Sequence, residues 1–168
     1  MKTINYIFAA SLFLFAACGG NDNKPASSGT DTSATSVTNN EASDLVEQTI
    51  TVTGSSMADM GYDPVSFSVK SGSKVKITLI NTHIEQGMVH NWVLVKLGSG
   101  QEVANAAIEA GLSKNYVPNN SNVIAASGLA QPKETISFEF IAPAVGSYNY
   151  ICTFPGHFPK MVGKLVVG

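Results

Sequence analysis

The chain is poor in charged residues, cysteine and histidine, and it contains no arginine. Only 13% of its 168 residues are charged, and its 12 acidic and 10 basic residues give a formal net charge of -2. It therefore lacks the broad positive field with which proteins attract nucleic acid. Two cysteines are too few for a zinc ribbon, and three histidines in the whole chain are too few for a multi-histidine catalytic centre in addition to any other metal site. These shortages argue against nucleic-acid binding and against an enzyme.

The N-terminal segment is typical of an export signal. Lys2 precedes an apolar run from Ile4 to Ala17, which is shorter than the ~20 residues that span a bilayer. The run ends in Phe15-Ala16-Ala17-Cys18-Gly19, which resembles the lipobox of bacterial lipoproteins apart from the missing leucine. Residues 1–17 are therefore predicted to be a lipoprotein signal peptide, and Cys18 the lipidated first residue of the mature chain. Ordinary cleavage without a lipid is the alternative.

Residues 18–46 are predicted to form a lipidated flexible tether. They are mainly Ser, Thr, Asn, Asp, Gly and Ala, which cannot bury enough apolar surface to offset the entropy of ordering. The protein is thus expected to be exported and lipid-anchored to a bacterial cell membrane, facing the periplasm or the cell exterior. With Cys18 acylated, Cys152 is the one remaining thiol of the mature chain. An unpaired thiol in an oxidising compartment suggests a specific role such as metal binding.

Residues 47–168 are predicted to form one all-β domain. Short segments of β-branched and aromatic residues alternate with turn formers, a pattern typical of a β-sandwich or barrel. The segment Gln101–Gly111 departs from it, because a valine and three alanines share one helical face and predict a short helical insertion. The predicted strands are 48–53, 64–69, 74–81, 91–96, 122–126, 135–141, 147–152 and 164–167.

The residues most suggestive of chemistry lie within the segment 152–161. Cys152, His157 and Met161 place a thiol, an imidazole and a thioether on a tight loop between two predicted strands, where all three can face one centre. His90 precedes another predicted strand and can project toward the same end of the sandwich. Taken singly, such residues are more often structural, the methionine as a core filler and the cysteine as a small buried hydrophobe. His83 has no such neighbours and is predicted to be a surface or loop histidine.

Two histidines, one cysteine and a long axial methionine are the ligand set of blue-copper electron-transfer sites. Thiolate and thioether favour Cu(I), and imidazole accepts either copper state, so one fixed geometry can serve both. Structural zinc sites use cysteine and histidine without methionine, and catalytic zinc keeps an open position. The sequence therefore predicts one copper ion, cycling between Cu(I) and Cu(II), with four ligands: His90, Cys152, His157 and Met161.

The spacing Cys-x4-His-x3-Met and the upstream run His90-Asn91-Trp92 resemble the azurin and auracyanin type of cupredoxins, from Gln48 to the C-terminus. The helical insertion and the region 116–124 look closest to auracyanin. The resemblance implies a Greek-key β-sandwich or barrel of the cupredoxin type. Azurins carry a disulfide, which this chain could not form with Cys18 lipidated and Cys152 bound to copper.

The resemblance also implies a role for each residue of the site. Three ligands would be equatorial and Met161 a weak axial one. Asn91 and the backbone amide of Phe154 would support the sulfur of the cysteine. Azurins have a glycine before the first histidine, and its carbonyl approaches the metal. Val89 stands at that position here, so its carbonyl is only a candidate weak axial contact.

The implied function is transfer of single electrons between redox proteins such as cytochromes or membrane oxidoreductase complexes, without a small-molecule substrate. In the azurin-like picture the electron passes through an exposed edge of His157, inside an apolar docking patch formed by Met88, Phe154, Pro155, Phe158 and Pro159. Simple loop packing is the alternative for these residues. A copper storage or delivery protein without redox turnover is the alternative function. A fragment of a multicopper oxidase or nitrite reductase is disfavoured by the single domain and the few histidines.

Overall fold

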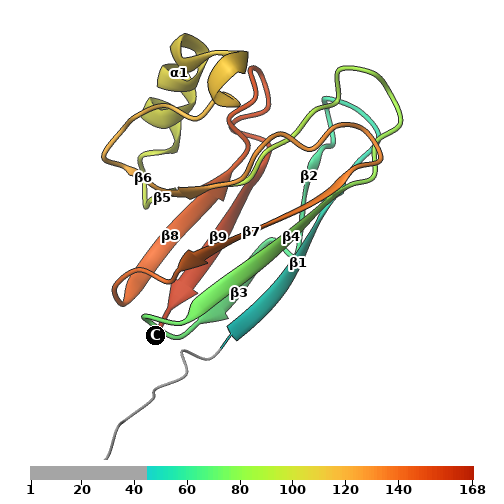
Figure 1. Cartoon of the computed structure of the whole chain (residues 1–168). Helices are drawn as coiled ribbons and strands as arrows, with labels where there is room; N and C mark the ends of the chain where they lie inside the picture. Colours follow the sequence, from blue (N-terminus) through green and yellow to red (C-terminus); the bar gives the residue numbers. More distant parts are fainter. Residues whose placement is uncertain (1–44) are drawn as a thin grey trace, which may run out of the picture. The chain divides into compact units, whose positions relative to one another are not determined.

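The computed structural model describes residues 45–168, which form two β-sheets and one α-helix, α1 (Gly100–Ala110), followed by a short 3-10 helix, η1 (Leu112–Lys114) (Figure 1). The predicted signal peptide and all of the predicted tether except its last two residues lie outside this range. No helix within it is long and apolar enough to cross a membrane. The strands are β1 (Leu45–Thr53), β2 (Gly61–Asp63), β3 (Ser66–Val69), β4 (Lys74–Asn81), β5 (Val93–Lys96), β6 (Val123–Ala126), β7 (Thr135–Ile141), β8 (Gly146–Ile151) and β9 (Val162–Val167).

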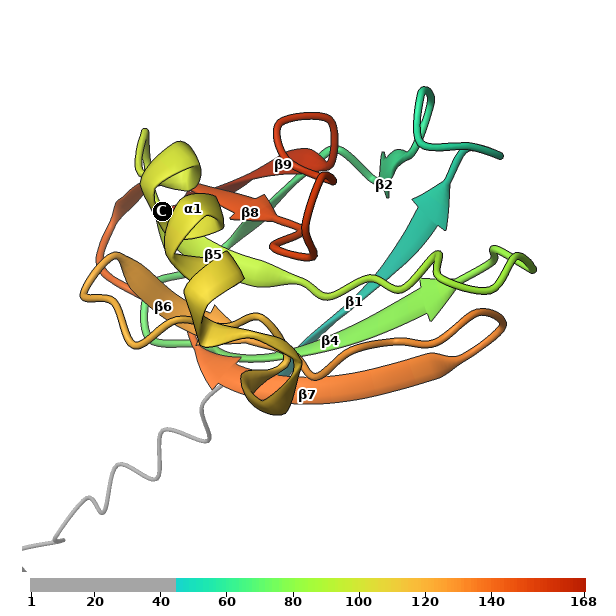
Figure 2. The ribbon, with the colours of Figure 1, turned by 90° about the horizontal axis from the view of Figure 1, so that it is seen from above.

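The two sheets are mixed and face one another (Figures 1 and 2). The four-stranded sheet has the order β2-β1-β4-β7, and the five-stranded sheet has the order β3-β9-β8-β5-β6. Strand β1 runs parallel to β4 and β3 runs parallel to β9, whereas the other neighbours are antiparallel. Helix α1 lies beside β5 and β6 (Figure 2). The predicted all-β sandwich with one short helical insertion is confirmed.

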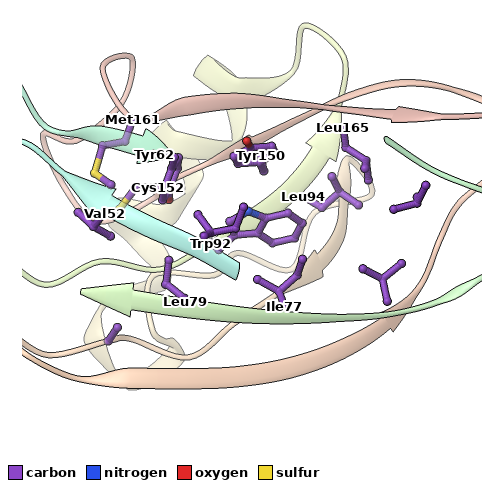
Figure 3. Close-up of a cluster of buried hydrophobic side chains, with 14 of the residues drawn as sticks. Val52, Tyr62, Ile77, Leu79, Trp92, Leu94, Tyr150, Cys152, Met161 and Leu165 are labelled. Carbon is purple, nitrogen blue, oxygen red and sulfur yellow. The ribbon is translucent and has the colours of Figure 1, made fainter. Parts of the chain in front are cut away.

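Alternation along the strands builds the interior. In β4 the apolar side chains Val75, Ile77 and Leu79 are buried, while every second residue is only partly buried. Trp92 lies between the sheets without solvent exposure, and its ring centroid is 5.2 Å from that of Tyr150 (Figure 3). Full burial of such a side chain contributes roughly 1.5–3 kcal/mol or more. The core therefore fixes the chain close to the first predicted ligand, two residues before Trp92.

Strand β5 is buried on both of its faces, because α1 covers the face turned away from the main core. Leu94 belongs to the main core, whereas Val93 and Val95 form a second apolar cluster with Val103 of α1 and Ile151 of β8. The sequence of a strand that is buried on both faces is a continuous apolar run, without alternation of apolar and polar residues. This packing holds the ends of β5 and β8 together.

Six of the eight predicted strands differ from the structure by one to three residues at a boundary, and two short elements were not predicted. Strand β1 begins at Leu45, so it includes the last two residues of the predicted tether. The sequence did not predict β2, and the predicted strand 64–69 begins only at Ser66. Pro64 has no amide hydrogen to donate to a sheet, and the chain crosses from one sheet to the other at this point. Helix η1 was also not predicted.

Candidate metal centre

The four predicted ligands lie at one end of the five-stranded sheet. Cys152 follows β8, Met161 precedes β9, and His90 lies shortly before β5. These strands are neighbours, with Val93 paired to Ile151 and Ile151 paired to Val162. Their ends therefore carry the ligand side chains into the same space. None of the four ligands is more than 1% exposed.

The ligand atoms converge at a separation that suits a metal ion. The Sγ atom of Cys152 lies 3.4 Å from Nδ1 of His157 and 4.0 Å from Nδ1 of His90. Metal bonds of about 2.0 Å to nitrogen and 2.3 Å to sulfur, ~120° apart, would place nitrogen and sulfur ~3.7 Å apart. The thioether of Met161 points toward Cys152 (Figure 3). The donor set and its spacing both fit a metal site.

The segment 152–161, here called the ligand loop, is held by its own backbone hydrogen bonds. The amide of Cys152 donates to the carbonyl of Met161 at 3.1 Å, and the amide of Met161 donates to the carbonyl of His157 at 3.1 Å. The amide of His157 donates in turn to the carbonyl of Phe154 at 3.1 Å. Gly156 has φ +85°, a left-handed conformation that glycine adopts without strain. Backbone hydrogen bonds thus fix the shape of the ligand loop.

His90 is fixed by a different set of contacts. Its amide donates to the carbonyl of Ala130 at 3.1 Å, and the amide of Ala130 donates to the carbonyl of His90 at 2.7 Å. The side-chain amide of Asn81, at the end of β4, donates to the carbonyls of Met88 at 2.8 Å and Ala130 at 3.0 Å. The segment that carries His90 is therefore attached to both sheets.

Asn91 connects the His90 segment to the ligand loop. Its Oδ1 accepts the amide hydrogen of Thr153 at 2.8 Å, and its Nδ2 donates to Oγ1 of Thr153 at 2.8 Å and to the carbonyl of Asn115 at 2.9 Å. The hydroxyl of Thr153 donates to the carbonyl of Tyr116 at 2.7 Å. Asn115 and Tyr116 have φ of 53° and 55°, a conformation that is costly for a tyrosine. Sequence reasoning found Asn91 but missed its two partners, Thr153 and Asn115, which carry no local signal.

Residues 48–168 match the family model described as copper binding proteins, plastocyanin/azurin family. The chain belongs to this family. Auracyanin-A of Chloroflexus aurantiacus is 45% identical over 117 residues, which are 68% of this chain and 71% of that protein. Azurin iso-2 of Methylomonas sp. is 39% identical over 83 residues, 47% of this chain and 64% of the azurin. A solved structure of auracyanin A, described as a "blue" copper protein, has a TM-score of 0.66 at 41% identity. The match covers 74% of this chain and 100% of that chain.

In this cupredoxin, His90, Cys152, His157 and Met161 are arranged as a type 1 copper site, as predicted. Burial, together with the neighbouring imidazoles, lowers the pKa of His90 to about 3 and that of His157 to about 4. Both rings are therefore neutral in the ordinary pH range, with lone pairs available to a metal.

The thiol of the cupredoxin responds to burial in the opposite direction. Burial raises the pKa of Cys152 to about 11, against the lowering effect of hydrogen bonds from the backbone amides of Asn91 and Phe154 and from the Tyr62 side chain. Without metal the thiol keeps its proton at neutral pH, and a bound metal ion would displace it. The supporting roles of Asn91 and of the Phe154 amide at the sulfur stay predictions.

His83 is not a surface histidine, so that part of its prediction was wrong. It lies in the loop after β4, but it is only 4% exposed and its ring centroid is 5.1 Å from that of His90. The side chain of Asn81 accepts the His83 amide hydrogen at 3.1 Å, which turns the loop inward. Nδ1 of His83 is 3.8 Å from a carboxylate oxygen of Glu85.

The edge of His157 is also less open than expected, because its side chain is only 1% exposed and the ring of Phe154 lies 4.9 Å from it. Phe158 packs against Gly100 at the start of α1, where an added Cβ would come within 2.7 Å of its ring. The docking role stays a prediction, as does the carbonyl contact of Val89. Among the predicted patch residues, Pro159 is exposed. The other four are partly buried: Met88, Phe154, Pro155 and Phe158.

Proposed function

We propose that this cupredoxin carries single electrons between redox proteins by cycling one copper ion between Cu(I) and Cu(II). The observation that carries the proposal is the convergence of two neutral imidazoles, a thiol and a thioether in one buried site. Copper supplies the one-electron couple. The chain's contribution is rigidity, because hydrogen bonds within the ligand loop and through Asn91 hold the donor atoms in one arrangement.

Burial of the site supports a carrier rather than an enzyme. A catalytic metal keeps a coordination position open to water or substrate. Here the thioether of Met161 points toward the thiol of Cys152, and the four ligands are at most 1% exposed. We therefore expect no small-molecule substrate.

We further propose that the partners are cytochromes or membrane oxidoreductase complexes, which dock on the apolar patch beside His157. Residues 47–168 contain eight lysines and eight acids, so long-range steering toward a charged partner is weak. A small apolar contact suits the short-lived complexes of redox proteins. The lipobox-like run that ends at Cys18 supports attachment to the outside of a bacterial membrane.

Absorption spectroscopy tests the central claim. Cu(II) is added to the purified full-length protein, and the visible spectrum is recorded before and after ascorbate, with Cys152→Ala as the control. An intense band that bleaches on reduction, returns on reoxidation and is missing in the variant supports the carrier. A colourless protein that still binds copper, or prefers zinc, would instead indicate storage or delivery.

The anchor has a separate test in the expressing bacterium. Full-length protein and a Cys18→Ala variant are expressed with radiolabelled palmitate and fractionated. The proposal predicts label and membrane association for the parent and neither for the variant. An unlabelled parent protein would contradict the lipid anchor without affecting the copper site.

A further inference from the structure

Tyr62 reaches the copper site from the opposite sheet. It lies on β2 of the four-stranded sheet, whereas the ligands lie at the ends of strands in the five-stranded sheet. Its side chain is 2% exposed, and its ring centroid is 5.5 Å from that of Tyr150, two residues before Cys152. Figure 3 shows Tyr62 directly beside Cys152. No part of the sequence motif pointed to this residue.

The hydroxyl of Tyr62 has one proton, which two acceptors at the site can share. It donates a hydrogen bond to the carbonyl of Asn91, the residue after His90. It also lies within hydrogen-bonding reach of the Cys152 sulfur, where it joins the backbone amides of Asn91 and Phe154. Burial raises the pKa of Tyr62 well above its usual value, so the hydroxyl remains a donor. One hydroxyl group thus contacts both segments that carry ligands.

We propose that Tyr62 is a positioning residue for electron transfer, whose hydroxyl holds the Asn91 carbonyl and stabilises the negative charge on the Cys152 sulfur. The inference rests on the proposed electron-carrier function. More negative charge resides on the sulfur when copper is reduced, because Cu(II) withdraws more electron density from it. A donor at the sulfur therefore favours Cu(I), and hydrogen bonds to a ligating sulfur are known to tune potential.

Tyr62→Phe tests this, since it removes one oxygen atom and keeps the ring. Hydrogen bonds to charged groups contribute about 1.5–3 kcal/mol, of which only the part that differs between the oxidation states shifts the redox equilibrium. We expect the equilibrium with a redox mediator of known potential to move about three- to tenfold toward Cu(II), where tenfold corresponds to about 59 mV for one electron. The sulfur-to-copper absorption band should move to longer wavelength, because the sulfur electrons are less stabilised.

Tyr150→Phe is the matched control. Tyr150 is another buried tyrosine of the same core, and its hydroxyl also donates to a backbone carbonyl, that of Pro64, at 2.5 Å. Loss of this hydroxyl affects stability by a similar mechanism but does not remove a donor from the sulfur. Its redox equilibrium and absorption band should therefore match those of the parent protein.

Site-specific replacement of Tyr62 by 3-fluorotyrosine keeps the hydroxyl and makes it a stronger donor, so it tests the idea if Tyr62→Phe does not fold. It should shift the equilibrium toward Cu(I), opposite to the phenylalanine variant. Unchanged potential and band in the Tyr62 variants would overturn the inference and leave the carrier function intact. A parent protein without a reversible coloured copper site would instead overturn the proposed function.

Discussion

Copper uptake should release close to one proton per ion, even in mild acid. In the metal-free protein the thiol of Cys152 has a pKa of about 11, and the imidazoles of His90 and His157 have pKa values of about 3 and 4. At pH 5 the thiol is therefore fully protonated, while the two imidazoles together carry only ~0.1 proton. Binding displaces all of these protons, ~1.1 in total. Solvent-exposed histidines with pKa values near 6.5 would raise the total to ~2.9.

The assay is a pH-stat titration of the full-length metal-free protein with Cu(II) in unbuffered salt solution, at pH 5 and pH 6. The base consumed per bound copper gives the proton number directly. About one equivalent is expected at both pH values, and a Cys152→Ala variant should consume almost none. A value near three at pH 5 would refute the reasoning, because it would show that the site is open to water before the metal binds. A value near zero would show that the thiol is already ionised.

Three further predictions concern stability. The folded-state pKa values of the two ligand histidines lie below their usual 6.5, so the unfolded chain binds more protons than the folded chain between pH 6.5 and about 4. The free energy of unfolding of the metal-free protein, measured in urea, should therefore fall by up to ~1.4 kcal/mol per pH unit for each histidine as the pH drops through that range. A flat pH profile would contradict this. Asn91→Ala removes three hydrogen bonds, two of them to Thr153, and should lower the free energy of unfolding in urea by about 2–4 kcal/mol. A loss below ~1 kcal/mol would mean that other contacts hold the ligand loop. Gly163→Ala would bring a Cβ within 2.0 Å of the Tyr150 ring. We therefore expect the free energy of unfolding to fall by at least about 1–3 kcal/mol, and the melting temperature measured by calorimetry to fall with it. An unchanged melting temperature would show that the ring moves aside freely.

The ligands could be predicted because their signal is local. Cys152, His157 and Met161 share one loop, and their spacing alone places three donors of the right chemistry together. His90 could be added because it stands just before an apolar run that predicts a strand. The strands themselves followed from alternation and turn residues, although β2, whose three residues begin with a glycine and are followed by a proline, carried too little pattern.

The surroundings of the ligands could not be predicted, because they depend on contacts between segments distant in the sequence. His83 is buried only because the Asn81 side chain turns its loop toward the site. Tyr62 meets the Cys152 sulfur only because the two sheets face one another at this end. Neither position has a neighbour in the sequence that signals its role.

The arrangement of strands also bears on the order in which the ligands assemble during folding. Strands β8 and β9 flank the ligand loop and pair with each other, so a hairpin alone brings a thiol, an imidazole and a thioether together. The second imidazole arrives only when β5 pairs with β8, a contact between Val93 and Ile151 that closes a much longer loop. The hairpin by itself therefore brings together only three of the four ligands, and the site is complete only once β5 has joined the sheet.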